Sequence, residues 1–212
     1  MTRHTTATLF LLVLVPIASA QDARDSPDQP PVQVEPGEFK LDEPTSLDFK
    51  AAHKPFGADG TSWWSLGAGA AFNGEATDVN AYAMTHFFIA EDFEFNLTFG
   101  GFYHDQDGED AASGNFAIGF RWHFKSDPKQ SCYFDFGIGL LGASGEVPDK
   151  GTEFNFTPRA GVGTTIKLSD ESQARLDLGV RWHHISNANT SGGDDNPSRD
   201  SIMVYAGVSW PF

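Results

Sequence analysis

A histidine and a serine stand two residues apart near the C-terminal end of the chain, as His184 and Ser186, and the carboxylate of Asp200 follows them. A serine hydroxyl is a weak nucleophile until a neutral imidazole takes its proton, and a carboxylate on the other ring nitrogen fixes the tautomer. The tetrahedral oxyanion also needs hydrogen-bond donors, for which Asn187 and Asn196 are the side-chain candidates. Together these residues have the chemistry of a serine-dependent hydrolase.

The elements that must position these residues are strands. From Phe93 to Phe99 every second residue is apolar, and the same alternation recurs from Asn115 to Phe124. Side chains two apart on a strand share a face, so each run has one apolar face and one small or polar face. We predict eight such strands, over residues 61–72, 77–90, 93–104, 114–124, 131–144, 152–168, 173–186 and 200–212.

The predicted fold class is all-β, an eight-stranded antiparallel outer-membrane β-barrel. The predicted connections alternate in length along the chain, those after the first, third, fifth and seventh strands being longer than the connections next to them, as in barrels whose long loops lie outside the cell. The alternative is a soluble lipocalin-like barrel or a β-sandwich, which would bury the second face in a dry core at high cost. The charged and histidine residues on that face are Arg121, His123, Asp135, Arg159, Arg175, Asp177 and Arg181.

Aromatic residues also favour the membrane barrel. The chain ends with Trp210, Pro211 and Phe212, which resembles the C-terminal assembly signal of outer-membrane barrels. Tryptophans gather at the interfaces between membrane and water, so the five tryptophans are predicted to form such girdles. They are Trp63, Trp64, Trp122, Trp182 and Trp210.

The N-terminal part of the chain predicts export. Residues 1–20 combine an early arginine, an apolar stretch and the ending Ala18-Ser19-Ala20, which is typical of a secretory signal peptide. Residues 21–58 are acidic and rich in proline, and are predicted to form a flexible periplasmic arm. Residues 59–212 are then the transmembrane barrel, with the catalytic site.

The net charge and the cysteine and histidine residues limit which partners and cofactors the protein is expected to bind. The net charge of −15 argues against nucleic acid. The only cysteine, Cys132, excludes an internal disulfide and suits packing. Adjacent residues on a strand point to opposite faces, so His183 and His184 cannot chelate one metal ion. No metal and no organic cofactor are expected.

Strand parity gathers the candidate residues. His184 and Ser186 continue the apolar register of the seventh strand, and Asp200 shares the apolar register of the eighth, so all three are predicted to face lipid. The long connection between these strands makes them neighbours, which brings Asp200 beside His184 at the outer rim. Asp194 and Asp195 are rival partners for His184. The plainer alternative is that His184 and Ser186 are polar residues at the headgroup level.

The run His184-Ile185-Ser186-Asn187-Ala188, followed by Asn196 and Asp200, resembles the lipid A 3-O-deacylase (PagL-type acyloxyacyl hydrolase) family over residues 61–212. The resemblance implies an eight-stranded outer-membrane barrel that hydrolyses the acyl ester at the 3-position of lipid A. It implies that Ser186 is the nucleophile and His184 the base, and links Asn187 and Asn196 to the oxyanion hole. Well-known members have a glutamate as the third residue, where this chain has Asp200.

Several expectations about substrate and partners follow from this resemblance. The substrate is lipid A or lipopolysaccharide, and the site lies at the outer leaflet of a Gram-negative outer membrane. A phospholipase or general lipid esterase is one alternative, and a non-enzymatic barrel for adhesion or envelope stability is another. The acidic stretch 105–110 is favoured as a solvated loop, with divalent cations that bridge it to lipid phosphates as the alternative. The sequence is compatible with a homodimer and does not decide the oligomeric state.

Overall fold

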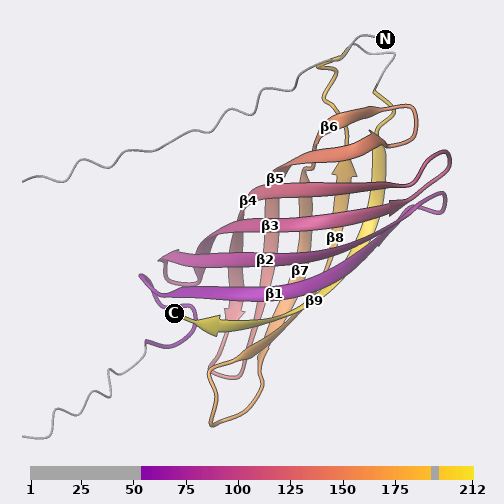
Figure 1. Cartoon of the computed structure of the whole chain (residues 1–212). Coiled ribbons are helices and arrows are strands. Elements are labelled where there is room, and N and C mark those ends of the chain that lie inside the picture. Colours follow the sequence, from indigo (N-terminus) through magenta and orange to yellow (C-terminus); the bar gives the residue numbers. More distant parts are fainter. Residues whose placement is uncertain (1–53, 192–195) are drawn as a thin grey trace, which may run out of the picture. The chain divides into compact units, whose positions relative to one another are not determined.

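The computed structural model describes residues 54–191 and 196–212, which form one closed antiparallel sheet (Figure 1). The predicted signal peptide and residues 21–53 of the predicted arm lie outside the described residues. The strands are β1 (Ser62–Phe72), β2 (Thr77–Ala90), β3 (Phe93–Asp105), β4 (Ala111–Ser126), β5 (Gln130–Val147), β6 (Thr152–Phe156), β7 (Arg159–Lys167), β8 (Arg175–Ile185) and β9 (Arg199–Pro211).

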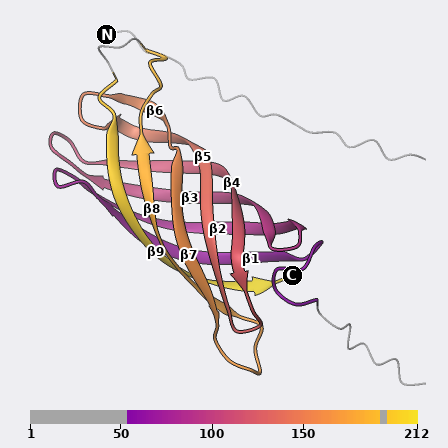
Figure 2. The ribbon, with the colours of Figure 1, turned by 180° about the vertical axis from the view of Figure 1, so that it is seen from behind.

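Closure of the sheet confirms the predicted eight-stranded all-β barrel. Strand β9 pairs with both β1 and β8, and β4 pairs with β5, so the sheet has no free edge along the barrel wall (Figures 1 and 2). Strands β6 and β7 both pair with β5 and form one strand of the barrel, interrupted at Thr157 and Pro158. Proline has no N–H for the ladder, which explains the interruption. No helix in the described part of the chain is long and apolar enough to cross a membrane.

The polar face of the strands lines the inside of the barrel. Arg121 Nη1 donates to Asp177 Oδ2 at 2.9 Å, and the guanidinium lies 4.2 Å from the centroid of the Tyr133 ring. Buried charges persist when they are paired in this way. The residues predicted for the inner face are all buried, namely Arg121, His123, Asp135, Arg159, Arg175, Asp177 and Arg181.

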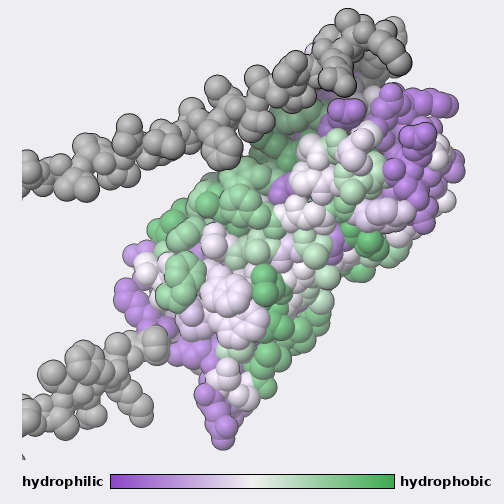
Figure 3. Space-filling view, in the orientation of Figure 1, coloured by the Kyte–Doolittle hydropathy of each residue, from purple (hydrophilic) through white to green (hydrophobic). Residues whose placement is uncertain are grey.

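The apolar face of the strands covers the outside. Figure 3 shows hydrophobic residues around the middle of the barrel and hydrophilic ones toward its two ends. An outward apolar band between polar rims is what a bilayer requires of a barrel. Exposed apolar side chains of this band include Phe99, Phe116, Ile118, Trp122, Phe124, Phe134, Phe136, Ile138, Val162, Val180 and Ile202.

Two predictions about the ends of the barrel are wrong. Trp63 does not join an interfacial girdle: it is buried and shares its parity with the inward Ser65, while Trp64 is exposed. The predicted arm also ends earlier than residue 58. The centroid of the Phe56 ring lies 5.0 Å from that of the Trp63 ring and 4.2 Å from Cζ of the Arg175 guanidinium. Phe56 thus closes the end of the barrel at which β9 ends.

The predicted contrast between long and short connections holds except at one place. Residues 186–198, between β8 and β9, form the longest connection. At the opposite end of the barrel, however, the connection formed by residues 168–174 is longer than the connections 73–76, 106–110 and 148–151. The reason is that β4 and β5 extend further than their apolar alternation predicts. Ser113 pairs with Ala143, and β5 continues to Val147, so expected loop residues are strand.

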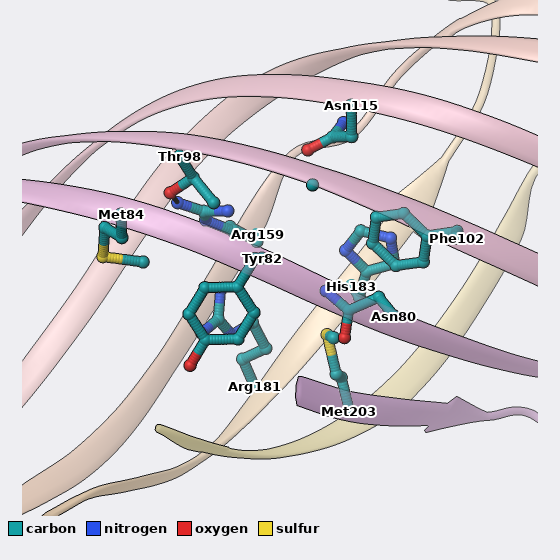
Figure 4. Close-up of a pocket in the computed structure, with 11 residues that line it drawn as sticks. Asn80, Tyr82, Met84, Thr98, Phe102, Asn115, Arg159, Arg181, His183 and Met203 are labelled. Carbon is teal, nitrogen blue, oxygen red and sulfur yellow. Dashed lines mark hydrogen bonds between the residues drawn. The ribbon is translucent and has the colours of Figure 1, made fainter. Parts of the chain in front are cut away.

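The lumen is filled by side chains. A cavity of about 20 Å³ lies at mid-barrel, between side chains that reach in from opposite walls (Figure 4). This volume accommodates about one water molecule, whereas pockets for organic ligands measure roughly 300–1,000 Å³. Chemistry on a large substrate must therefore take place outside this lumen. The lining includes Asn80, Tyr82, Thr98, Asn115, Arg159, Arg181 and His183.

Candidate active site

The candidate residues meet where β8 ends and β9 begins. Ile185, the last residue of β8, is buried in an apolar cluster with Ala111, Leu141 and Val147, which fixes the inward direction at this level. Because neighbouring residues alternate, His184 has the outward parity. The pairing of β8 continues past the first residue of its partner β7, because His184 N donates to Pro158 O at 3.0 Å.

His184 and Asp200 lie directly opposite each other on neighbouring strands, as predicted. His184 Nδ1 and Asp200 Oδ1 are 2.8 Å apart, which is a hydrogen bond with the carboxylate as acceptor. The Asp200 side chain is 63% exposed and that of His184 19%. With the proton on Nδ1, the other ring nitrogen, Nε2, is a base. The rival acids Asp194 and Asp195 lie outside the described residues.

Ser186 follows two residues after His184 and is more enclosed than predicted. It pairs with Phe156 of β6: Phe156 N donates to Ser186 O at 2.7 Å, and Ser186 N donates to Phe156 O at 3.2 Å. The residue is 8% exposed, so it is a buried residue rather than one open to lipid. Among the described side chains, no hydrogen bond joins the Ser186 hydroxyl to the His184 ring.

A tight turn follows the serine at once. Ala188 and Asn189 have φ of 53° and 60°, and Thr190 N donates to Asn187 O at 3.1 Å. Positive φ at both central residues is the mark of a type I′ turn, and it is unusual for alanine. The turn therefore fixes the backbone at Asn187, which is 1% exposed.

Asn196 comes back across the loop to this turn. Its Oδ1 accepts a hydrogen bond from Asn187 N at 3.0 Å, and its Nδ2 donates to Asn189 Oδ1 at 3.0 Å. The structure thus brings together Asn196 and Asn187, as it does His184 and Asp200. The two asparagines meet through backbone and side-chain contacts that the linear spacing does not reveal.

Sequence reasoning missed further Ser–His–carboxylate sets inside the barrel. His104 Nε2 lies 2.8 Å from Ser113 Oγ, and His104 Nδ1 lies 2.7 Å from Asp78 Oδ1. His104 and Asp78 have exposures of 0% and 1%, so this set has no contact with bulk solvent through them. Its residues come from three strands, and their register was needed to find it. A similar set nearer the C-terminal end comprises Ser65, His86 and Glu94, with 2.9 Å at each contact.

The described residues contain no group of three or more histidine, cysteine, aspartate or glutamate side chains that could hold a metal ion. His184 and Asp200 supply a polarised imidazole, and Ser186 supplies a hydroxyl close to it along the chain.

Comparisons with known proteins agree with this fold. The sequence model of the lipid A 3-O-deacylase (PagL) family matches residues 75–209. Comparison with curated protein sequences finds no match. Neisserial surface protein A (NspA) is similar at a TM-score of 0.53 and 16% identity, over 71% of this chain and 97% of that chain. The N-terminal β-barrel domain of Pseudomonas aeruginosa OprF is similar at 0.50 and 13% identity, over 73% and 98%.

A third structure in the comparison is that of the outer membrane enzyme PagL, with a TM-score of 0.49 and 21% identity over 70% of this chain and 99% of that chain. The likeness to the first two structures confirms the fold of an outer-membrane barrel. The family match spans the whole region from His184 to Asp200.

Proposed function

The chain belongs to the lipid A 3-O-deacylase (PagL) family, and we propose that it is an outer-membrane serine esterase that removes the acyl chain ester-linked at the 3-position of lipid A. One observation carries the catalytic part of this proposal. His184 Nδ1 lies 2.8 Å from Asp200 Oδ1 on the outer face of the barrel, two residues before Ser186.

Acylation begins at Ser186. The Ser186 Oγ attacks the ester carbonyl carbon while His184 Nε2 takes the hydroxyl proton, and Asp200 stabilises the resulting imidazolium. The Ser186 hydroxyl and the His184 ring come within hydrogen-bond distance when substrate binds. Catalytic hydrogen bonds are often long without substrate and shorten in the complex. The C–O bond to the sugar then breaks, and the leaving alkoxide takes the proton from His184.

Deacylation repeats these steps with water. His184 removes a proton from a water molecule that attacks the acyl-Ser186 ester, and the fatty acid leaves as Ser186 regains its proton. The oxyanion of each tetrahedral intermediate needs hydrogen-bond donors. We assign this role to the side-chain amides of Asn187, in the turn, and of Asn196. Asn196 Nδ2 carries two N–H groups, one of which is directed to Asn189.

The place of the site on the barrel supports a lipid substrate. His184 and Asp200 lie on the outward face, at the end of the barrel that carries the longest connection, residues 186–198. Outer-membrane barrels carry their longer loops on the extracellular side. We therefore infer that the site faces the outer leaflet, where lipid A is located, and that the substrate enters sideways from the membrane.

The test compares two serines in the same barrel. Ser186→Ala is expected to abolish acyl release from purified lipid A by the detergent-folded protein, as measured by mass spectrometry of the lipid and of the free fatty acid. Ser113→Ala is the matched control, since this interior serine also contacts a histidine that binds a carboxylate. It should leave acyl release unchanged.

The lipid products decide between substrate classes. Loss of one 3-linked acyl chain from lipid A, with phospholipids intact, supports the proposal. Cleavage of phospholipids instead would identify a phospholipase or general lipid esterase. Unchanged release by the Ser186→Ala protein would refute the serine mechanism.

A further inference from the structure

A tryptophan on the outer face lies beside the His184–Asp200 pair. Trp182 Nε1 donates a hydrogen bond of 2.7 Å to Asp200 Oδ1, the same oxygen that contacts His184 Nδ1 at 2.8 Å. From this geometry we propose that Trp182 is a positioning residue that holds the Asp200 carboxylate against His184. The inference rests on the proposed function, because it assigns a role within that site.

Strand register explains how the three side chains meet. Asp200 lies directly opposite His184, and Trp182 lies opposite Ile202. Trp182 is therefore a diagonal neighbour of Asp200, a separation that large aromatic side chains can bridge. Trp182 and His184 share a face of β8, and their ring centroids are 5.5 Å apart.

The chemistry of indole limits Trp182 to positioning. Its N–H is a donor only, so it can bind the carboxylate but cannot accept the serine proton. Asp200 needs such a contact because its side chain is 63% exposed and would otherwise be free to rotate away from the imidazole. The bond also gains strength where lipid excludes water. Trp182 is itself 41% exposed on the apolar face. Its ring therefore makes no buried core contact as important as its hydrogen bond to Asp200.

Trp182→Phe removes the donor and keeps an aromatic ring. A hydrogen bond to a charged group is strong enough that its loss should lower kcat by about ten- to a hundredfold. KM should change little, because the ring that faces lipid remains. Trp122→Phe is the matched control: Trp122 is 53% exposed on the apolar face of β4, and its ring contacts are with Phe124 and Phe134.

A double-mutant cycle separates positioning from a general effect on the barrel. If Trp182 acts through Asp200, Trp182→Phe should cost nothing further in an Asp200→Ala background. The rate of Ser186 labelling by a serine-directed phosphonate reports this even when turnover is very slow, since labelling needs a single attack. A full cost of Trp182→Phe in the Asp200→Ala background would overturn the inference.

An NMR measurement tests the contact without any activity. In the folded protein with ¹⁵N-labelled tryptophan, Asp200→Ala should shift the Trp182 indole N–H resonance, while the Trp122 resonance stays in place. An unmoved Trp182 resonance would refute the hydrogen bond. Failure of the proposed function has a different signature, since wild-type protein would then release no more acyl chain than the Ser186→Ala protein, whatever the NMR spectrum shows.

Discussion

The inside and the outside of this barrel carry the same three kinds of side chain in different settings. In the lumen, Ser113, His104 and Asp78 are joined by contacts of 2.8 and 2.7 Å. On the outer face, His184 and Asp200 are joined at 2.8 Å, and Ser186 has no hydrogen bond to the ring among the described residues. The more complete hydrogen-bonded set is thus the interior one.

The difference teaches that contact geometry alone does not identify a hydrolase. The buried Asp78 also accepts two hydrogen bonds from Arg199 Nη2, at 2.6 and 2.8 Å, so its charge is neutralised within the wall. The interior set therefore satisfies buried polar groups, as a barrel lumen requires. The outer set instead has an exposed acid at the edge of an apolar surface, which is where we propose that an ester-bearing lipid meets the site.

Replacing each of the two histidines in turn is expected to give the largest difference between the outer set and the interior set. His184→Gln removes the base and is expected to lower acyl release by roughly 10⁴- to 10⁶-fold, as in other serine hydrolases. His104→Gln should leave the activity per folded barrel unchanged, because its serine is not reached by substrate. The assay is acyl release, normalised to the folded fraction. Equal losses in the two variants would contradict the assignment of chemistry to the outer face.

Asp200 offers the next largest effect and also tests its rivals. Asp200→Asn should lower kcat by roughly 10³- to 10⁴-fold, because an amide N–H facing Nδ1 favours the wrong imidazole tautomer. Asp200→Glu keeps the negative charge and should lose less. Asp194→Asn and Asp195→Asn are the matched controls, with activity retained. If either control lost as much as Asp200→Asn, that residue would be the better candidate for the acid.

Much of this arrangement was predictable because parity on a strand is local. Alternation alone identified the inward Arg121 and Asp177 and the outward His184 and Asp200. Parity also placed Trp182 beside His184, although the prediction assigned it to a girdle. The error at Trp63 arose from composition, since its parity with Ser65 points inward.

What the sequence could not reveal depends on register and on backbone turns. Ser113, His104 and Asp78 lie on three strands, and they meet because Asp78 pairs with His104. Likewise, the enclosure of Ser186 depends on its bridge to Phe156, across a strand that Pro158 interrupts. Such pairings are set by turn geometry and bulges, which alternation in one strand does not encode.

The smallest expected effect on the reaction comes from Asp177, which lies on the same strand as His184 but faces the lumen. Asp177→Asn leaves the Arg121 guanidinium with longer contacts to Glu94 and Asp135, at 3.7 and 3.9 Å. Removing one partner of a buried ion pair costs about 3–5 kcal/mol, so the free energy of unfolding should fall by that amount.

Urea unfolding in detergent micelles measures this loss, with Asp170→Asn in the exposed turn 168–174 as the control that keeps wild-type stability. Acyl release per folded Asp177→Asn barrel should equal that of the wild type, because Asp177 is at the far end of β8 from Ser186. A variant that kept its stability but lost its activity would show that the lumen network acts on the outer site. The division between an interior that stabilises and an exterior that reacts would then be wrong.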